Sequence, residues 1–203
     1  MNLANKLTVF RMILVPVLVI IPFLNLPGEW LGISTAFWVM DAIFILASLT
    51  DKLDGYIARS RNLVTTFGKF LDPLADKILV LSALVMLVEF GRMPAWIPVI
   101  VLAREFIVSG YRLVAVEKGG KVVAASIWGK LKTATQMVAI TLAFLDTNVF
   151  FAFANEAARS TMNTGNLVLN IVTSVLMAVS VVATIFSGWD YLKDSKELFK
   201  GSM

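Results

Sequence analysis

Residues 51–76 read DKLDGYIARSRNLVTTFGKFLDPLAD, a segment with four aspartates between two strongly hydrophobic stretches. Ionisable residues at the depth of a bilayer are costly, rarely face lipid and mark functional sites. Four carboxylates this close together repel one another unless protons or cations neutralise them. Ligand sets made only of oxygen suit hard cations such as Mg²⁺, Mn²⁺ or Ca²⁺. The segment therefore predicts a carboxylate metal site at one face of a membrane protein.

The composition also indicates a membrane protein. The chain has 203 residues, 58% of them hydrophobic, and its mean hydropathy of +0.81 is far above that of soluble domains. It contains no Cys, which excludes thiolate metal sites, disulfides and cysteine nucleophiles. It also contains no His, so any proton transfer must fall to a carboxylate, a Lys or a Tyr.

Several hydrophobic runs approach the roughly 20 residues that a spanning helix needs. We expect six spans, at about residues 9–26, 33–52, 70–90, 94–115, 123–145 and 166–189. The predicted fold is all-α and membrane-integral, a bundle of six transmembrane helices that forms a single domain over residues 1–203.

The basic residues are unevenly shared between the two sides of this predicted bundle. With six spans both termini lie on one side, together with all of the 18 Lys and Arg residues except Arg92 and Arg159. Lys and Arg concentrate in the cytoplasmic loops of membrane proteins. We therefore expect cytoplasmic termini, a multi-pass protein in the cell membrane, and an aspartate cluster that faces the cytoplasm.

The spacing of the four aspartates predicts two pairs, each on one helical face. Asp51 and Asp54 are three residues apart, and Asp72 and Asp76 are four residues apart. A short connection makes the two helices antiparallel neighbours, and two divalent cations would balance the four negative charges. Pro73 is expected near the start of the second helix, where its missing N–H costs little.

Two other interpretations of the cluster stay open at this point. The aspartates could be solvated loop residues paired with Lys52, Lys69 or Lys77, although loop acids need not form two same-face pairs. They could also form the ion pathway of a transporter. Transporter sites usually lie near the middle of the bilayer on broken helices, whereas this cluster lies at one end of its predicted helices.

The aspartates belong to a longer pattern that resembles a known family signature. That pattern is Asp51-x2-Asp54-Gly55-x2-Ala58-Arg59-x8-Gly68-x3-Asp72-x3-Asp76. It is similar to the complete signature of the CDP-alcohol phosphatidyltransferases. The resemblance implies a six-helix membrane bundle, a homodimer and a di-metal site at the cytoplasmic surface. The implied reaction is attack by an alcohol hydroxyl on the lipid-bearing phosphate of a CDP-lipid, with release of CMP.

Within that family the chain looks most like the phosphatidylglycerophosphate synthases. The matching stretches are NKLTVFR at 5–11, FLDPLADK at 70–77, REFIVSGYR at 104–112 and GKLKTATQM at 129–137. The implied substrates are CDP-diacylglycerol and sn-glycerol 3-phosphate. Inositol phosphate or phosphatidylglycerol as the acceptor remains open, and nucleic acid is not expected as a partner.

The resemblance also implies roles for individual residues. The implied ligands of two divalent cations, Mg²⁺ or Mn²⁺, are Asp51, Asp54, Asp72 and Asp76. Asp76 additionally resembles the general base that takes the proton of the acceptor hydroxyl, a role open to a carboxylate beside a divalent cation. The implied CDP-lipid contacts are Asn5, Thr8, Gly55, Arg59, Thr65 and Gly68.

Basic residues predict a site for the acceptor. Glu105 and Arg112 lie on one face of the fourth span, and Lys132 and Gln136 share a face of the fifth. An acceptor that carries its own phosphate needs cations of this kind. The predicted phosphate-binding residues are Arg104, Arg112, Lys130 and Lys132. The competing interpretation is that such residues anchor the helices to anionic lipid.

Overall fold

The computed structural model describes residues 3–60, 66–117 and 127–199. Nearly all of these residues are helical, which confirms the expected all-α class. The elements are α1 (Leu3–Ile20), η1 (Ile21–Leu24), β1 (Glu29–Trp30), β2 (Ile33–Ser34), α2 (Thr35–Ser60), α3 (Thr66–Glu89), α4 (Trp96–Glu117), α5 (Ile127–Leu145), η2 (Ala152–Ala154), α6 (Glu156–Thr161) and α7 (Thr164–Phe199).

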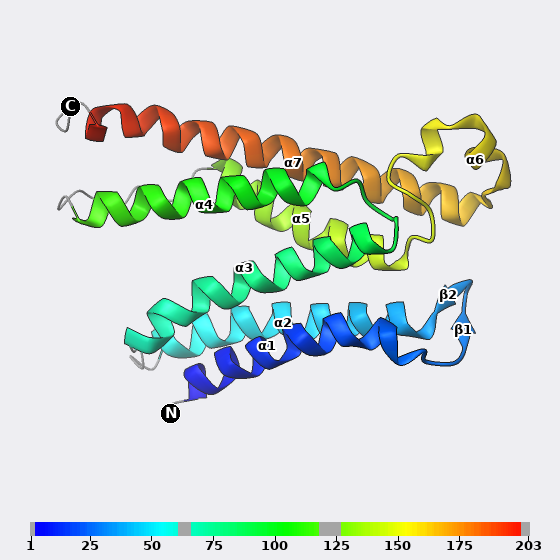
Figure 1. Ribbon diagram of the computed structural model, residues 1–203, viewed down its shortest axis with the longest axis horizontal. Coiled ribbons are helices and arrows are strands. Elements are labelled where there is room, and N and C mark those ends of the chain that lie inside the picture. Colours follow the sequence, from blue (N-terminus) through cyan, green and yellow to red (C-terminus); the bar gives the residue numbers. More distant parts are fainter. Residues whose placement is uncertain (1–2, 61–65, 118–126, 200–203) are drawn as a thin grey trace.

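The long helices lie lengthwise in one bundle, and helices that follow one another in the chain run in opposite directions (Figure 1). Both termini lie at the same end of the bundle, together with the end of α2 and the start of α3. The β1–β2 hairpin and α6 lie at the opposite end. The shared end of the two termini agrees with the topology expected from the sequence.

Each expected span overlaps one long helix in the described part of the chain. By length and hydropathy, the helical stretches Asn5–Leu24 and Thr164–Lys193 suffice to cross a membrane within the described residues, and Thr35–Thr50 is a shorter apolar helix. The helices thus agree with the expected ranges, while the count of six membrane crossings stays a prediction.

The boundaries of α2 and α3 differ from those expected. α2 continues eight residues beyond the expected end of its span, because the aspartate-bearing segment contains no proline and continues the helix to Ser60. α3 begins at Thr66, so Pro73 lies in the interior of the helix and not in its first turn. The expectation for Pro73 was therefore wrong, and the proline cannot donate the usual hydrogen bond to the carbonyl of Lys69.

A continuous apolar core joins the long helices. Its fully buried members include Leu18, Met40, Phe44, Leu79, Leu84, Leu87, Ile97, Ile140, Phe144 and Met177. Large apolar side chains are also exposed on the outside of the bundle, among them Phe106 at 70% and Leu113 at 72%. Extensive apolar surface of this kind is typical of a face covered by a partner or by lipid.

Arg92 stabilises the end of the bundle opposite the termini. Its guanidinium donates to the carbonyls of Ala143 at 3.2 Å and Phe144 at 2.6 Å, in the last turn of α5, and lies 3.5 Å from the centre of the Phe37 ring. A cation is favourable at a helix C-terminus. Burial lowers the pKa of Arg92 to about 10, against the opposing effect of Asp146, so the side chain stays charged at neutral pH. Arg92 thus joins the C-terminal end of α5 to Phe37 of α2.

Candidate active site

The four aspartates lie on the facing ends of two consecutive helices. Asp72 and Asp76 are one turn apart on α3, and both are partly exposed. Asp51 and Asp54 lie on the last part of α2, whose backbone is helical to Ser60, while the side chains of residues 51–60 lie outside the description. Asp54 lies six residues before the end of α2, and Asp72 lies six residues after the start of α3. Because the two helices are antiparallel, these positions have similar depth in the bundle.

Thr8 contacts one of these carboxylates directly. It is 1% exposed on α1, and its hydroxyl donates a hydrogen bond of 2.6 Å to Oδ1 of Asp72, 64 positions away in the chain. Asn5, which is also buried, precedes Thr8 by one turn of the same helix. Gly68 is buried one turn before Asp72 on α3. Of the residues predicted to contact CDP-lipid, Thr8 therefore bonds a described carboxylate, Gly68 lies one turn before that carboxylate on α3, and Asn5 lies one turn before Thr8 on α1.

The donor chemistry of this end of the bundle fits divalent cations. Asp72 and Asp76 offer carboxylate oxygens, which are the ligands that hard cations prefer. The hydroxyl of Thr8 donates to Asp72, and a hydrogen bond of this kind orients a carboxylate that binds a metal ion. Within the described side chains no group of three acidic, His or Cys residues is close enough to hold a cation. The two further carboxylates of the predicted set, Asp51 and Asp54, lie outside those side chains.

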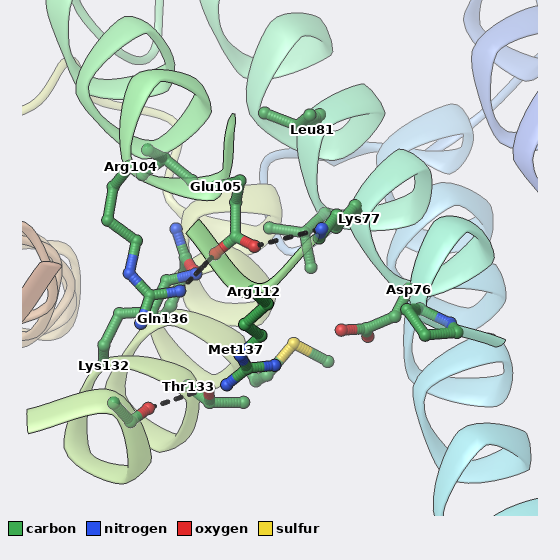
Figure 2. A pocket seen from close by; sticks show the side chains of 14 residues that line it. Asp76, Lys77, Leu81, Arg104, Glu105, Arg112, Lys132, Thr133, Gln136 and Met137 are labelled. Atoms are coloured by element: carbon green, nitrogen blue, oxygen red, sulfur yellow. Dashed lines mark hydrogen bonds and ion pairs between the residues drawn. The ribbon is translucent and has the colours of Figure 1, made fainter. Parts of the chain in front are cut away.

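A cavity of about 240 Å³ lies between α3, α4 and α5, and Asp76 is part of its lining. Figure 2 shows the Asp76 carboxylate directed into it from α3, with the side chains of Arg104, Glu105 and Lys132 on the opposite wall. The charged residues of the lining are Asp76, Lys77, Arg104, Glu105, Arg112 and Lys132. Four cations against two carboxylates leave the lining with a surplus of two positive charges.

Glu105 connects three of these cations. Its Oε1 accepts hydrogen bonds from Lys132 at 2.6 Å and from Arg104 at 2.9 Å, and its Oε2 lies 3.9 Å from the ammonium of Lys77. Lys77 also donates to the hydroxyl of Ser109. The Glu105 side chain is only 15% exposed, so these ion pairs are poorly screened by water. One carboxylate thus gathers cations from α3, α4 and α5 at the cavity wall.

Three of the four predicted acceptor residues meet at this cavity. Arg104, Arg112 and Lys132 line it, whereas Lys130 is exposed and is not part of the lining. Lys77 also lines it, a residue for which the sequence pattern predicted no binding role. The available signal was its place at the end of FLDPLADK, at 70–77, a stretch that already matched the family.

The remaining predicted contacts of the CDP-lipid are Gly55, Arg59 and Thr65. Gly55 and Arg59 belong to the last part of α2, where the structure describes the backbone alone, and Thr65 lies outside the described residues. Their roles stay predictions from the family resemblance.

Comparison with known proteins agrees with the signature. The family model for CDP-alcohol phosphatidyltransferase matches residues 1–186. The chain belongs to this family. It is 40% identical, over 99% of its length and 98% of the relative's, to a protein of Bacillus subtilis (strain 168) named CDP-diacylglycerol–glycerol-3-phosphate 3-phosphatidyltransferase. A protein of the same name from Rickettsia typhi is 36% identical over 98% of this chain and 99% of its own.

A third relative carries a name that matches the group suggested by the sequence. It is a probable phosphatidylglycerophosphate synthase of Mycobacterium tuberculosis, 37% identical over 94% of this chain and 80% of its own. The family resemblance inferred from the aspartate pattern is therefore confirmed. Family membership and the apolar helices together make this a membrane protein.

Proposed function

We propose that this protein transfers the phosphatidyl group of CDP-diacylglycerol to sn-glycerol 3-phosphate, giving phosphatidylglycerophosphate and CMP. The names of relatives that match along nearly the whole chain support the two substrates. The geometry supports the same reaction, because one cavity has a carboxylate on one wall and clustered cations on another. That juxtaposition is the observation on which the proposal rests most heavily.

Two divalent cations, Mg²⁺ or Mn²⁺, are the proposed cofactors. Asp51, Asp54 and Asp72 would hold one, and Asp51, Asp72 and Asp76 would hold the second. When bound, such cations neutralise the diphosphate of the CDP-lipid and stabilise CMP as the leaving group. Thr8 keeps Asp72 in a fixed orientation through its hydroxyl. Asn5, Gly55, Arg59, Thr65 and Gly68 remain the proposed contacts of the CDP-lipid.

Asp76 is the proposed general base. It takes the proton from the acceptor hydroxyl while that oxygen attacks the phosphorus that carries the diacylglycerol. The new oxygen–phosphorus bond forms as the bond between this phosphorus and the CMP phosphate oxygen breaks. The cavity supports this assignment because Asp76 faces the same space as the acceptor-binding cations. The sequence contains no His, which leaves a carboxylate, a Lys or a Tyr as the proton acceptor, and Asp76 is a carboxylate of this cavity.

The cations of the lining are proposed to bind the phosphate of the acceptor. Arg104, Arg112, Lys132 and Lys77 exceed the two carboxylates of the cavity by two charges, and they exceed Glu105 by three once Asp76 serves the divalent cations. A phosphate monoester carries about −1.5 to −2 charges at neutral pH and would offset most of this surplus. Arg offers paired N–H donors to phosphate, and Lys acts as a compact point charge. An uncharged alcohol acceptor would leave the surplus uncompensated, which favours a phosphorylated one.

The placement of the protein in the membrane is part of the proposal. We place the end that carries both termini and the aspartates at the cytoplasmic face of the cell membrane, with six crossings by α1–α5 and α7. The excess of basic residues at that end supports the orientation. A single domain over residues 1–203 and a homodimer complete the proposal, the dimer on the family resemblance alone.

Replacing Arg112 or Lys132 by Gln should raise the KM for glycerol 3-phosphate by roughly 10- to 150-fold, because a lost charge-assisted contact costs about 1.5–3 kcal/mol. The KM for CDP-diacylglycerol should stay within about twofold. Initial rates of CMP release with each substrate varied in turn give both constants. Lys130→Gln is the matched control on α5, because Lys130 lies outside the cavity lining. Equal effects of all three substitutions would show that only a general basic surface is involved.

Thr8→Val should weaken binding of the divalent cations by about 10- to 100-fold, as expected when an outer partner of a metal ligand is lost. The substitution removes the hydroxyl bonded to Asp72 and keeps the volume of the side chain. Thr8→Ser restores the donor and should recover most of the affinity. Titration of the purified protein with Mn²⁺, followed by electron paramagnetic resonance, measures this without turnover. Unchanged affinity in Thr8→Val would contradict a role of Thr8 in the metal site.

A further inference from the structure

Two residues of α7, outside the cavity lining, accept hydrogen bonds from the two arginines of the cavity. Arg104 donates through Nη2 to the hydroxyl of Ser187 at 2.5 Å, and Arg112 donates through Nη2 to the hydroxyl of Tyr191 at 2.9 Å. The residues that line the cavity come from α3, α4 and α5, and α7 contributes none of them in the described part of the chain. Ser187 and Tyr191 therefore act on the cavity only through the arginines.

These two α7 residues form one surface. They are four positions apart, so their side chains project from the same face of the helix. Ser187 is completely buried and Tyr191 is 3% exposed, which holds both hydroxyls in place. Between them, Gly188 lies against Arg104, since a Cβ at this position would be in van der Waals contact with Cγ of Arg104, at 3.4 Å.

The Tyr191 ring makes a second contact with both guanidinium groups. The Cζ of Arg112 lies 5.6 Å from the ring centre, and the Cζ of Arg104 lies 6.0 Å from it. At these distances a ring face attracts a cation. Tyr191 thus contacts the two arginines by its ring and bonds one of them by its hydroxyl. Arg112 is itself exposed, so without these contacts its long side chain would sample many rotamers.

We propose that Ser187 and Tyr191 are positioning residues for the phosphate of the acceptor, acting through Arg104 and Arg112. This inference rests on the proposed function, since it assumes that the arginines bind a phosphorylated acceptor. The chemical basis is preorganisation. An arginine already held in its binding geometry loses less conformational freedom when the phosphate arrives, and the affinity rises accordingly. The hydroxyls take no part in proton transfer.

Tyr191→Phe should raise the KM for glycerol 3-phosphate by about 3- to 10-fold, the loss expected when one side chain must be ordered by the ligand. The KM for CDP-diacylglycerol and the kcat should change by less than about twofold. Ser187→Ala should behave in the same way through Arg104. Tyr111→Phe and Ser180→Ala are the matched controls. Tyr111 packs its ring against that of Tyr191, and Ser180 is buried on α7 two turns from Ser187.

A double-mutant cycle separates positioning from mere packing. If Tyr191 acts through Arg112, Tyr191→Phe should have no further effect on kcat/KM for glycerol 3-phosphate in the Arg112→Gln background. Full additivity of the two substitutions, or an equal rise in KM in Tyr111→Phe, would overturn the inference. A wild-type protein that releases no CMP with glycerol 3-phosphate would instead overturn the proposed function. An active wild-type protein with an unchanged KM in Tyr191→Phe and Ser187→Ala would overturn the inference alone.

Discussion

Removal of divalent cations should abolish activity, and loss of Asp51 or Asp72 should lower it by about 10³-fold or more. Both residues are proposed to bind both cations, whose charge stabilisation is worth several kcal/mol, and about 1.4 kcal/mol corresponds to tenfold in rate. EDTA should therefore stop CMP release, and excess Mg²⁺ or Mn²⁺ should restore it. Asp54→Ala removes a ligand of one cation only and should be no more damaging than Asp51→Ala or Asp72→Ala.

Asp41→Asn is the control for these carboxylate substitutions. Asp41 is the lone acid in the apolar part of α2, 4% exposed and ten residues before Asp51. Its replacement should leave the dependence on divalent cations unchanged. Full activity of the wild-type protein in EDTA would exclude the metal site, whatever the variants do.

Asp76→Asn should lower turnover by about 100-fold or more, while binding of CDP-diacylglycerol largely persists. Asn keeps the size of the side chain and one oxygen, but it cannot accept the proton of the acceptor hydroxyl. Single-turnover rates of CMP release and equilibrium binding of CDP-diacylglycerol measure the two quantities. The position of Asp76 on the cavity wall opposite the acceptor-binding cations is the structural reason for this expectation.

Asp76 is also a proposed metal ligand, so the loss of the base must be separated from the loss of a cation. Turnover of Asp76→Asn should stay low at saturating Mg²⁺ or Mn²⁺, whereas a mere weakening of metal binding would be corrected there. Turnover close to that of the wild-type protein would mean that the base lies elsewhere.

Local sequence pattern predicted the parts of the site that depend on helical spacing. The helix ranges and the same-face spacing of Asp72 and Asp76 follow from residues a few positions apart, and the structure contains them. Lys130 and Lys132 show the limit of such reasoning. The two residues are only two positions apart and so lie on different faces of α5, and helix packing decides which face meets the cavity.

Contacts between distant segments could not be predicted in this way. The hydrogen bond from Thr8 to Asp72 joins residues 64 positions apart, and those from Arg104 and Arg112 to α7 span 83 and 79 positions. In the sequence, Ser187 and Tyr191 look like ordinary residues of a buried helix face. Only the packing of α4 against α7 brings them to Arg104 and Arg112, which we propose they position. The prediction that Pro73 lies near the start of its helix was wrong, because α3 begins at Thr66, before the hydrophobic run that was used to place it.

The most direct test is the reaction itself. Purified protein in detergent or lipid is mixed with CDP-diacylglycerol and Mg²⁺ or Mn²⁺, and CMP release is measured with glycerol 3-phosphate, inositol phosphate, phosphatidylglycerol or no acceptor. The account predicts rapid CMP release with glycerol 3-phosphate and formation of phosphatidylglycerophosphate, identified by mass spectrometry. Faster turnover with another acceptor would mean that the cavity binds that acceptor and not glycerol 3-phosphate. CMP release with none of the acceptors would contradict the proposed transferase activity.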